Sequence, residues 1–193
     1  KKIKNYGVSL KSNKSRLFKL LHSGKNSYFF DINNFEKLDK LIFKIKPDII
    51  IHLAAEALVL KSYKNPLEAY KTNIFGTLNL LRVIKKYNFI KTGVFFTTDK
   101  VYENKDNGKN FKENDKLSGD DPYSGSKAAS EIVINSFTKS FLREKKIIIL
   151  RAGNIIGGGD YTKTRLIPDI IRSHLNKSIM RVRSPNSIRP WQH

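Results

Sequence analysis

Short apolar runs rich in β-branched and aromatic residues alternate along this chain with longer segments in which apolar residues recur every three or four positions. The apolar runs are residues 28–32, 48–53, 93–98 and 147–150, and the helical segments are residues 35–45, 65–87, 123–141 and 167–175. This alternation is typical of βαβ units, in which a helix returns the chain to start another parallel strand. The run at 48–53 has no polar alternation, so we expect a strand buried on both faces. The sequence therefore predicts an α/β fold with a doubly wound parallel sheet.

The composition narrows the classes of protein that remain. The chain has 193 residues and no cysteine, which excludes disulfides, thiolate zinc sites and cysteine nucleophiles. No apolar run approaches the roughly 20 residues that a membrane helix needs. The histidines do not show the spacing of metal ligands. We therefore expect a cytoplasmic protein with no metal site and no membrane partner.

The net charge of +20 comes from 37 Lys and Arg against 17 Asp and Glu. Clustered cations would favour binding to nucleic acid, because they neutralise phosphates. Here the lysines are spread through every segment, no run of five or six like charges occurs, and no DNA or RNA module is found. We interpret the charge as a compositional bias on a solvated surface and predict no nucleic-acid partner, with a basic interaction fragment as the alternative.

Tyr123 and Lys127 stand one helical turn apart and so share one face of the predicted helix. A tyrosine phenol ordinarily titrates near a pH of about 10, and a nearby ammonium favours the phenolate. Such a pair can take a proton from an alcohol while a hydride leaves for a nicotinamide. The spacing is weak evidence by itself, because it occurs often by chance.

The surroundings of the pair strengthen the functional interpretation. The run at 93–98 ends in Thr98-Asp99-Lys100, and ligands of open α/β sheets bind beyond the carboxyl ends of strands. The run at 48–53 ends in Leu53-Ala54-Ala55, and Asn73 lies between these two strands. Together with the Tyr–Lys pair, these residues resemble the extended short-chain dehydrogenase/reductase family of nucleotide-sugar enzymes. The resemblance implies a Rossmann-like fold and NAD as the cofactor.

Further motifs occur in family order along nearly the whole chain. They are residues 97–104, 113–115, 121–123, 151–160, 165–169 and 189–193. The set resembles the CDP-glucose 4,6-dehydratase subgroup, and its specific element is Asp99-Lys100. Sibling dTDP-glucose dehydratases usually have Asp-Glu there, and epimerases of the same fold generally lack an acid–base pair at this place. The resemblance implies a lyase that dehydrates CDP-glucose for the synthesis of deoxysugars in surface polysaccharides such as O-antigen. A dehydratase or epimerase of another nucleotide sugar, or a non-catalytic nucleotide-binding fragment, stays open as an alternative.

The resemblance also implies a role for individual residues. In the family reaction the sugar is oxidised at C4, water is eliminated across C5 and C6, and the hydride returns to C6. The catalytic residues implied are Thr98 at the C4 hydroxyl, Asp99 as acid, Lys100 as base, and the pair Tyr123 and Lys127. The NAD-binding residues implied are Asp31, Ile32, Leu53, Ala54, Ala55, Asn73, Tyr123 and Lys127. The substrate-binding residues implied are Thr98, Asn154, Arg165, Leu166 and Arg189, and for the two arginines a solvated surface role stays open.

The glycine-rich fingerprint that binds the cofactor's diphosphate is absent from the sequence, and residues 6–10 resemble the family's second strand. We therefore expect the first βα unit and the C-terminal substrate lobe to be missing. Residues 1–193 then form a partial NAD-binding domain, with the substrate-binding portion starting at about residue 154. Because the missing strand is central in a doubly wound sheet, we expect a gap in the sheet. The resemblance implies a homodimer for the full-length protein.

Overall fold

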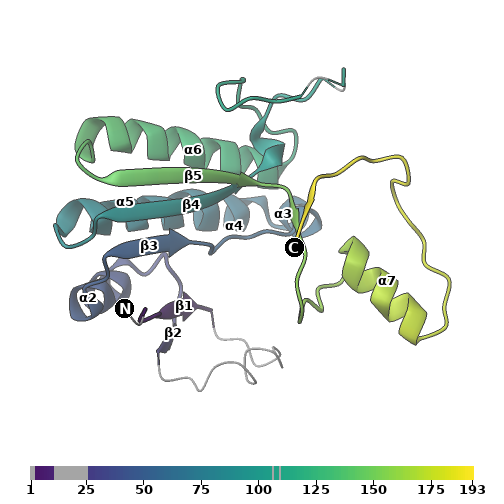
Figure 1. The fold of residues 1–193 in the computed structure, drawn as a ribbon, viewed down its shortest axis with the longest axis horizontal. Helices are drawn as coiled ribbons and strands as arrows, with labels where there is room; N and C mark the ends of the chain where they lie inside the picture. Colours follow the sequence, from purple (N-terminus) through teal and green to yellow (C-terminus); the bar gives the residue numbers. More distant parts are fainter. Residues whose placement is uncertain (1–2, 11–25, 106, 109) are drawn as a thin grey trace. The chain divides into compact units, whose positions relative to one another are not determined.

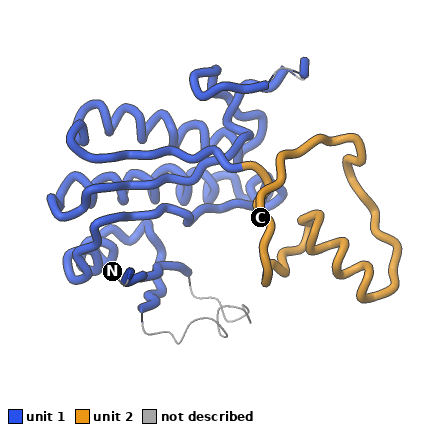
Figure 2. The backbone as a smooth tube through the Cα atoms, in the orientation of Figure 1, with its two compact units in different colours: residues 1–11, 26–152 blue, residues 12–25, 153–193 orange. Residues whose placement is uncertain are grey.

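The computed structural model describes residues 3–10, 26–105, 107–108 and 110–193. It divides the chain into two compact units, which Figure 2 colours separately. Of the residues that the structure describes, those up to Ala152 form the first unit and Gly153–His193 form the second.

The first unit alternates strands and helices (Figure 1). Its strands are β1 (Gly7–Ser9), β2 (Ser27–Phe29), β3 (Ile49–His52), β4 (Thr92–Thr98) and β5 (Lys146–Ala152). Its helices are α2 (Phe35–Ile45), α3 (Val59–Lys64), α4 (Pro66–Tyr70), α5 (Gly76–Lys86) and α6 (Pro122–Phe141), with a π-helical turn at Lys71–Phe75 and a 3₁₀ turn at Asp99–Val101. All pairings between these strands are parallel, which confirms the predicted α/β class.

The five strands form two sheets. β1 pairs with β2, and a second sheet has the order β3-β4-β5. In a doubly wound sheet the family's first strand would lie between the strand here called β1 and the one called β3. The break between the two sheets thus falls where the sequence predicts a gap.

Helices α2, α5 and α6 cover one face of the β3-β4-β5 sheet. The buried cluster on that face contains Leu38, Ile42, Ile50, Leu80, Leu81, Val83, Ile84, Ile90, Phe95, Ile134 and Leu142. The register places Ile49, Ile51 and Leu150 on the opposite face, where they are 56%, 59% and 41% exposed. The expectation that the strand at 48–53 is buried on both faces is therefore wrong for the described structure, because the first unit leaves that face open.

The predicted helix over residues 65–87 is divided into three pieces. α4 runs into the π-helical turn, and α5 continues from Gly76. A π-helical turn accommodates an extra residue in the helix and frees main-chain carbonyls from the usual ladder. The apolar spacing continues across the turn, so the sequence pattern could not show it.

The second unit contains β6 (Asn154–Ile155), α7 (Leu166–Leu175) and β7 (Trp191–Gln192). β6 pairs with β7 in parallel, and Gly153 packs so closely that an added Cβ would lie 2.9 Å from the carbonyl oxygen of Pro190. Strands of two residues carry no periodic signal, so neither was predicted. No helix in the part of the chain that the structure describes is long and apolar enough to cross a membrane.

Candidate active site

Three of the predicted catalytic residues lie at the end of β4. Thr98 is the last residue of the strand, opposite Ala152 of β5, and Asp99 and Lys100 open the 3₁₀ turn. The Thr98 hydroxyl donates to Asp99 Oδ1 at 3.1 Å and accepts from the backbone N–H of Lys100 at 3.4 Å. The strand end and the turn therefore hold these residues together.

Tyr123 and Lys127 lie in the first two turns of α6, whose start is fixed by a capping box. Asp121 accepts from the Ser124 N–H at 2.9 Å, and the Ser124 hydroxyl accepts from the Asp121 N–H at 3.1 Å. Asp121 also reaches the neighbouring turn, with its Oδ2 3.5 Å from Lys100 Nζ. This ion pair brings the Asp99–Val101 turn against the start of the helix that carries the Tyr–Lys pair.

Lys127 is only 7% exposed, and its Nζ donates to the carbonyl oxygen of Phe96 at 2.9 Å. Burial lowers the pKa of Lys127 to about 8, while the negative charge of Glu131 acts in the opposite direction. The side chain is still mostly protonated at neutral pH. Its ammonium is thus available to favour a phenolate one helical turn away.

Asn73 in the π-helical turn connects the loop after β3 to α6. Its Oδ1 accepts from the Glu56 N–H at 2.9 Å, and its Nδ2 donates to Ser126 Oγ at 2.7 Å. The Ser130 hydroxyl of α6 lies 2.8 Å from the main-chain carbonyl oxygen of Asn73 and 2.7 Å from that of Ser126. Asn73 therefore connects the loop that contains Ala55 to α6.

His52 contacts this network through Thr77, and its imidazole is neutral. The Thr77 hydroxyl donates its only proton to the Asn73 carbonyl at 2.6 Å, so His52 Nε2, 3.0 Å from that hydroxyl, is the donor. Burial and the nearby charge of Lys127 lower the pKa of His52 to about 3. A histidine held neutral in this way supports packing and offers no proton to a reaction at neutral pH.

Five of the predicted cofactor residues lie after β2 and β3, at the carboxyl ends where doubly wound folds bind nucleotides, while Asn73 is in the π-helical turn and Tyr123 and Lys127 are in α6. The Asp31 carboxylate accepts from Asn33 at 2.8 Å, and the Ile32 carbonyl accepts from Asn79 of α5 at 3.1 Å. Ala54 and Ala55 follow β3 after Leu53 and carry small side chains that allow a ligand to approach the backbone. The chemistry of these residues fits NAD. A carboxylate and the Tyr–Lys pair can hydrogen-bond to its hydroxyl groups, and the small residues leave room for its rings.

The other predicted substrate residues belong to the second unit: Asn154, Arg165, Leu166 and Arg189. Asn154 is in β6, Leu166 starts α7, and Arg165 Nη1 lies 3.8 Å from Asp160 Oδ2. Their contribution to the site stays a prediction. No group of three His, Cys, Asp or Glu side chains that could ligate a metal occurs among the described residues.

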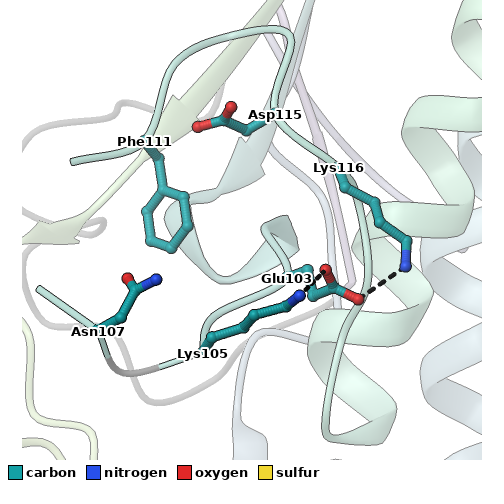
Figure 3. A pocket seen from close by; sticks show the side chains of 6 residues that line it. All are labelled: Glu103, Lys105, Asn107, Phe111, Asp115 and Lys116. Atoms are coloured by element: carbon teal, nitrogen blue, oxygen red, sulfur yellow. Dashed lines mark hydrogen bonds and ion pairs between the residues drawn. The ribbon is translucent and has the colours of Figure 1, made fainter. Parts of the chain in front are cut away.

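The loop that follows the 3₁₀ turn contains a separate hollow of about 270 Å³ (Figure 3). Its lining residues are Glu103, Lys105, Asn107, Phe111, Asp115 and Lys116. Glu103 forms ion pairs with Lys116 at 2.7 Å and with Lys105 at 3.6 Å, so both lysines of the hollow are paired with its carboxylate. None of the predicted catalytic residues lines it, and we do not assign the reaction to it.

Glu131 and Arg151 were not selected from the sequence, although the structure places both next to predicted catalytic residues. Glu131 is fully buried on α6, one turn beyond Lys127, and forms an ion pair with Arg151 of β5. The available signal was a carboxylate four residues after a lysine on the buried face of a helix.

Comparison with known proteins decides the family. The model of the NAD dependent epimerase/dehydratase family matches residues 2–193. This chain belongs to that family. The match agrees with the resemblance predicted from the sequence motifs.

Relatives within the family include two curated dehydratases. CDP-glucose 4,6-dehydratase of Salmonella typhimurium is 45% identical over 174 residues, which cover 86% of this chain and 48% of that protein. dTDP-D-glucose 4,6-dehydratase of Dictyostelium discoideum is 37% identical over 159 residues, which cover 77% of this chain and 36% of that protein. The chain thus spans about half the length of these relatives or less.

A solved structure of dTDP-glucose 4,6-dehydratase from Bacillus anthracis in complex with NAD matches with a TM-score of 0.77. It is 29% identical, and the match covers 91% of this chain and 53% of that one. This similarity confirms the Rossmann-like fold that the sequence predicts.

Proposed function

We propose that this chain is part of an NAD-dependent nucleotide-sugar 4,6-dehydratase that converts CDP-glucose to CDP-4-keto-6-deoxyglucose. The observation that carries the proposal is the Asp99-Lys100 turn, joined to the start of the catalytic helix by the 3.5 Å pair between Lys100 and Asp121. An epimerase of this family needs a Tyr–Lys pair for oxidation and reduction. Elimination of water needs an additional acid and base, and Asp99 and Lys100 supply both kinds of group.

NAD, held by the residues that follow β2 and β3, would supply the acceptor for the hydride of C4 and the donor of the hydride that reaches C6. Tyr123 takes the proton of the C4 hydroxyl, and the charge of Lys127 favours the phenolate that does so. The resulting 4-keto group acidifies the C5 hydrogen, which Lys100 removes as a proton. Asp99 protonates the departing C6 hydroxyl, which leaves as water, and Lys100 returns a proton to C5 when the hydride reaches C6. Thr98 hydrogen-bonds the C4 oxygen during these steps.

CDP-glucose is the proposed substrate because the 45% identical relative carries that name and because this chain has Asp-Lys at the end of β4. The second unit, from about residue 154, supplies the substrate-binding portion in this proposal. Arg165 and Arg189 suit the diphosphate, because a guanidinium can donate two parallel hydrogen bonds to phosphate oxygens. The product belongs to the precursors of deoxysugars in surface polysaccharides.

The test uses the complete reading frame that encodes this chain, incubated with NAD and, separately, with CDP-glucose, dTDP-glucose and UDP-glucose. We expect a 4-keto-6-deoxy product from CDP-glucose, identified by NMR and by a mass lower by one water. Inversion at C4 of any of these sugars without loss of water would overturn the dehydratase and support an epimerase. Dehydration of dTDP-glucose alone would overturn the nucleotide assignment.

We also propose that residues 1–193 by themselves bind NAD weakly, because their sequence has no glycine-rich turn for the diphosphate. Calorimetric titration of NAD into the purified chain measures this affinity. A dissociation constant in the micromolar range would contradict the proposal.

A further inference from the structure

One buried carboxylate joins three elements of the first unit. Glu131 of α6 has no exposed surface, and it accepts from Arg151 Nε at 3.0 and 3.1 Å and from Arg151 Nη2 at 2.6 Å. The Thr97 hydroxyl of β4 donates to the same carboxylate at 2.6 Å. Hydrogen bonding to Glu131 raises the pKa of Arg151, so the guanidinium keeps its charge. β4, β5 and α6 therefore meet at Glu131.

The other side of the Arg151 guanidinium holds the loop that follows the 3₁₀ turn. Arg151 Nη1 donates to the Glu113 carbonyl at 2.8 Å, and Arg151 Cζ lies 4.6 Å from the centre of the Tyr102 ring. Tyr102 in turn stacks on Phe111 with ring centres 4.6 Å apart and planes 5° from parallel. Arg151 thus uses its edge and its face to contact both ends of the segment Tyr102–Glu113.

The groups joined by this pair flank the proposed catalytic residues. Thr97 directly precedes Thr98 on β4, and Glu131 lies one turn beyond Lys127 on α6. A bidentate contact between a guanidinium and a carboxylate fixes the relative orientation of the two side chains as well as their distance. A buried ion pair is often no more stabilising than an apolar pair of the same volume, so fold stability alone does not account for it.

We propose that Glu131 and Arg151 are positioning residues that set α6 against the end of β4 and fasten the loop at 103–118 to β5. The effect on catalysis rests on the proposed dehydratase function, whereas the effect on the loop does not. Neither residue touches the reacting atoms in this account. They act through Thr97, the main chain of α6 and Tyr102.

The experiment compares two variants of the complete reading frame with the parent. Arg151→Lys keeps the positive charge but removes the planar guanidinium, and with it the bidentate contact to Glu131 and the contact with the Tyr102 ring. The double variant Glu131→Leu with Arg151→Met removes both charges at similar volume, and it retains the fold by the argument above. Arg82→Lys is the matched control, because Arg82 also lies over an aromatic ring, Phe35, but belongs to α5.

Two readouts separate positioning from simple destabilisation. Trypsin cleavage after Lys112 and Lys116, followed by mass spectrometry, is expected to accelerate by about tenfold in both variants while circular dichroism is unchanged. In the dehydratase assay we expect kcat to fall by about 10²-fold with little change in KM, since small misplacement of reacting groups costs that much. Arg82→Lys should match the parent in both readouts.

A folded double variant with the parent's cleavage rate and kcat would overturn the proposal. If Arg151→Lys does not fold, the double variant decides the question. If the parent dehydrates none of the nucleotide sugars, the proposed function fails, and the cleavage rates still decide whether the pair fastens the loop.

Discussion

At the scale of single residues, Lys127 shows how a residue of the candidate site lowers the free energy of unfolding. Its ammonium is buried in α6, and burial lowers its pKa from 10.5 to about 8. Below pH 8 the folded state carries a buried charge, and a shift of this size corresponds to about 3 kcal/mol. Between pH 8 and 10.5 the unfolded chain holds more protons at this residue, so the penalty disappears as the pH rises.

We therefore predict that Lys127→Met raises the free energy of unfolding by about 3 kcal/mol at pH 7 while it abolishes turnover. The difference from the parent should shrink towards zero as the pH approaches 10.5. Urea unfolding across this pH range measures it. Lys44→Met, at an exposed position of α2, is the control and should show no such dependence. A difference that does not change with pH would contradict the buried-charge argument.

The Asp99-Lys100 turn gives a second prediction at this scale. Lys100→Gln removes the proposed base, and Asp99→Asn removes the proposed acid, so each should lower kcat by about 10²- to 10⁴-fold. In deuterated water, we expect the parent to form product with deuterium at C5 of the sugar, measured by NMR, and Lys100→Gln to form it at the same lowered rate as its turnover. Lys139→Gln, at an exposed position of α6, is the control and should keep the kcat of the parent. Full turnover in Lys100→Gln would require a different base.

At the scale of elements, Gly76 at the start of α5 connects helix packing to the predicted cofactor residues. A Cβ at this position would lie 2.9 Å from Ile32 Cγ1 and overlap the end of that side chain. Gly76→Ala should therefore displace Ile32 and weaken NAD binding by the complete reading frame about tenfold, although alanine favours the helix by about 1 kcal/mol. Calorimetry measures the affinity. Gly157→Ala, with no atom within 4 Å, is the control, and equal affinities for both variants would contradict the prediction.

The sequence predicted most elements of the first unit because their apolar spacing is long and regular. α2, β3, β4, β5 and α6 begin within one residue of the predicted segments, and so does α7 of the second unit. The sequence pattern predicted neither α3 nor the π-helical turn. α3 has only six residues, and the π-helical turn preserves the apolar spacing around it. Such details depend on side-chain contacts like those of Asn73 with Glu56 and Ser126.

The candidate site was predictable where motifs follow strands, and less so where distant residues meet. Thr98 ends a strand, Asp99 and Lys100 follow it, and Tyr123 and Lys127 lie near the start of a helix. These positions and the resemblance of their motifs to the family together selected them, because the spacing alone was weak evidence. Glu131 and Arg151 are 20 positions apart, and their pairing depends on the packing of α6 on β5. A sequence without aligned relatives carries no sign of that contact.

At the scale of the whole molecule, the first unit has a sheet with unequal faces. α2, α5 and α6 bury one face, while Ile49, Ile51 and Leu150 on the other are each at least 41% exposed. Parallel sheets are normally covered on both faces by helices. The described residues of this chain therefore expose apolar surface of the kind that proteins usually cover.

Two adjacent isoleucines of β3 test this asymmetry. Ile50 is 8% exposed and belongs to the buried cluster, so Ile50→Thr should lower the free energy of unfolding by about 2–3 kcal/mol through lost packing and a buried hydroxyl. Ile51 is 59% exposed, so Ile51→Thr should change it by less than about 0.5 kcal/mol. Ile51→Thr should instead reduce binding of the apolar dye ANS to the purified chain, because it removes apolar surface from the open face. Urea unfolding and dye fluorescence of the two variants make the comparison. Equal losses of stability would mean that both faces of the sheet are covered, contrary to the open face described for the first unit.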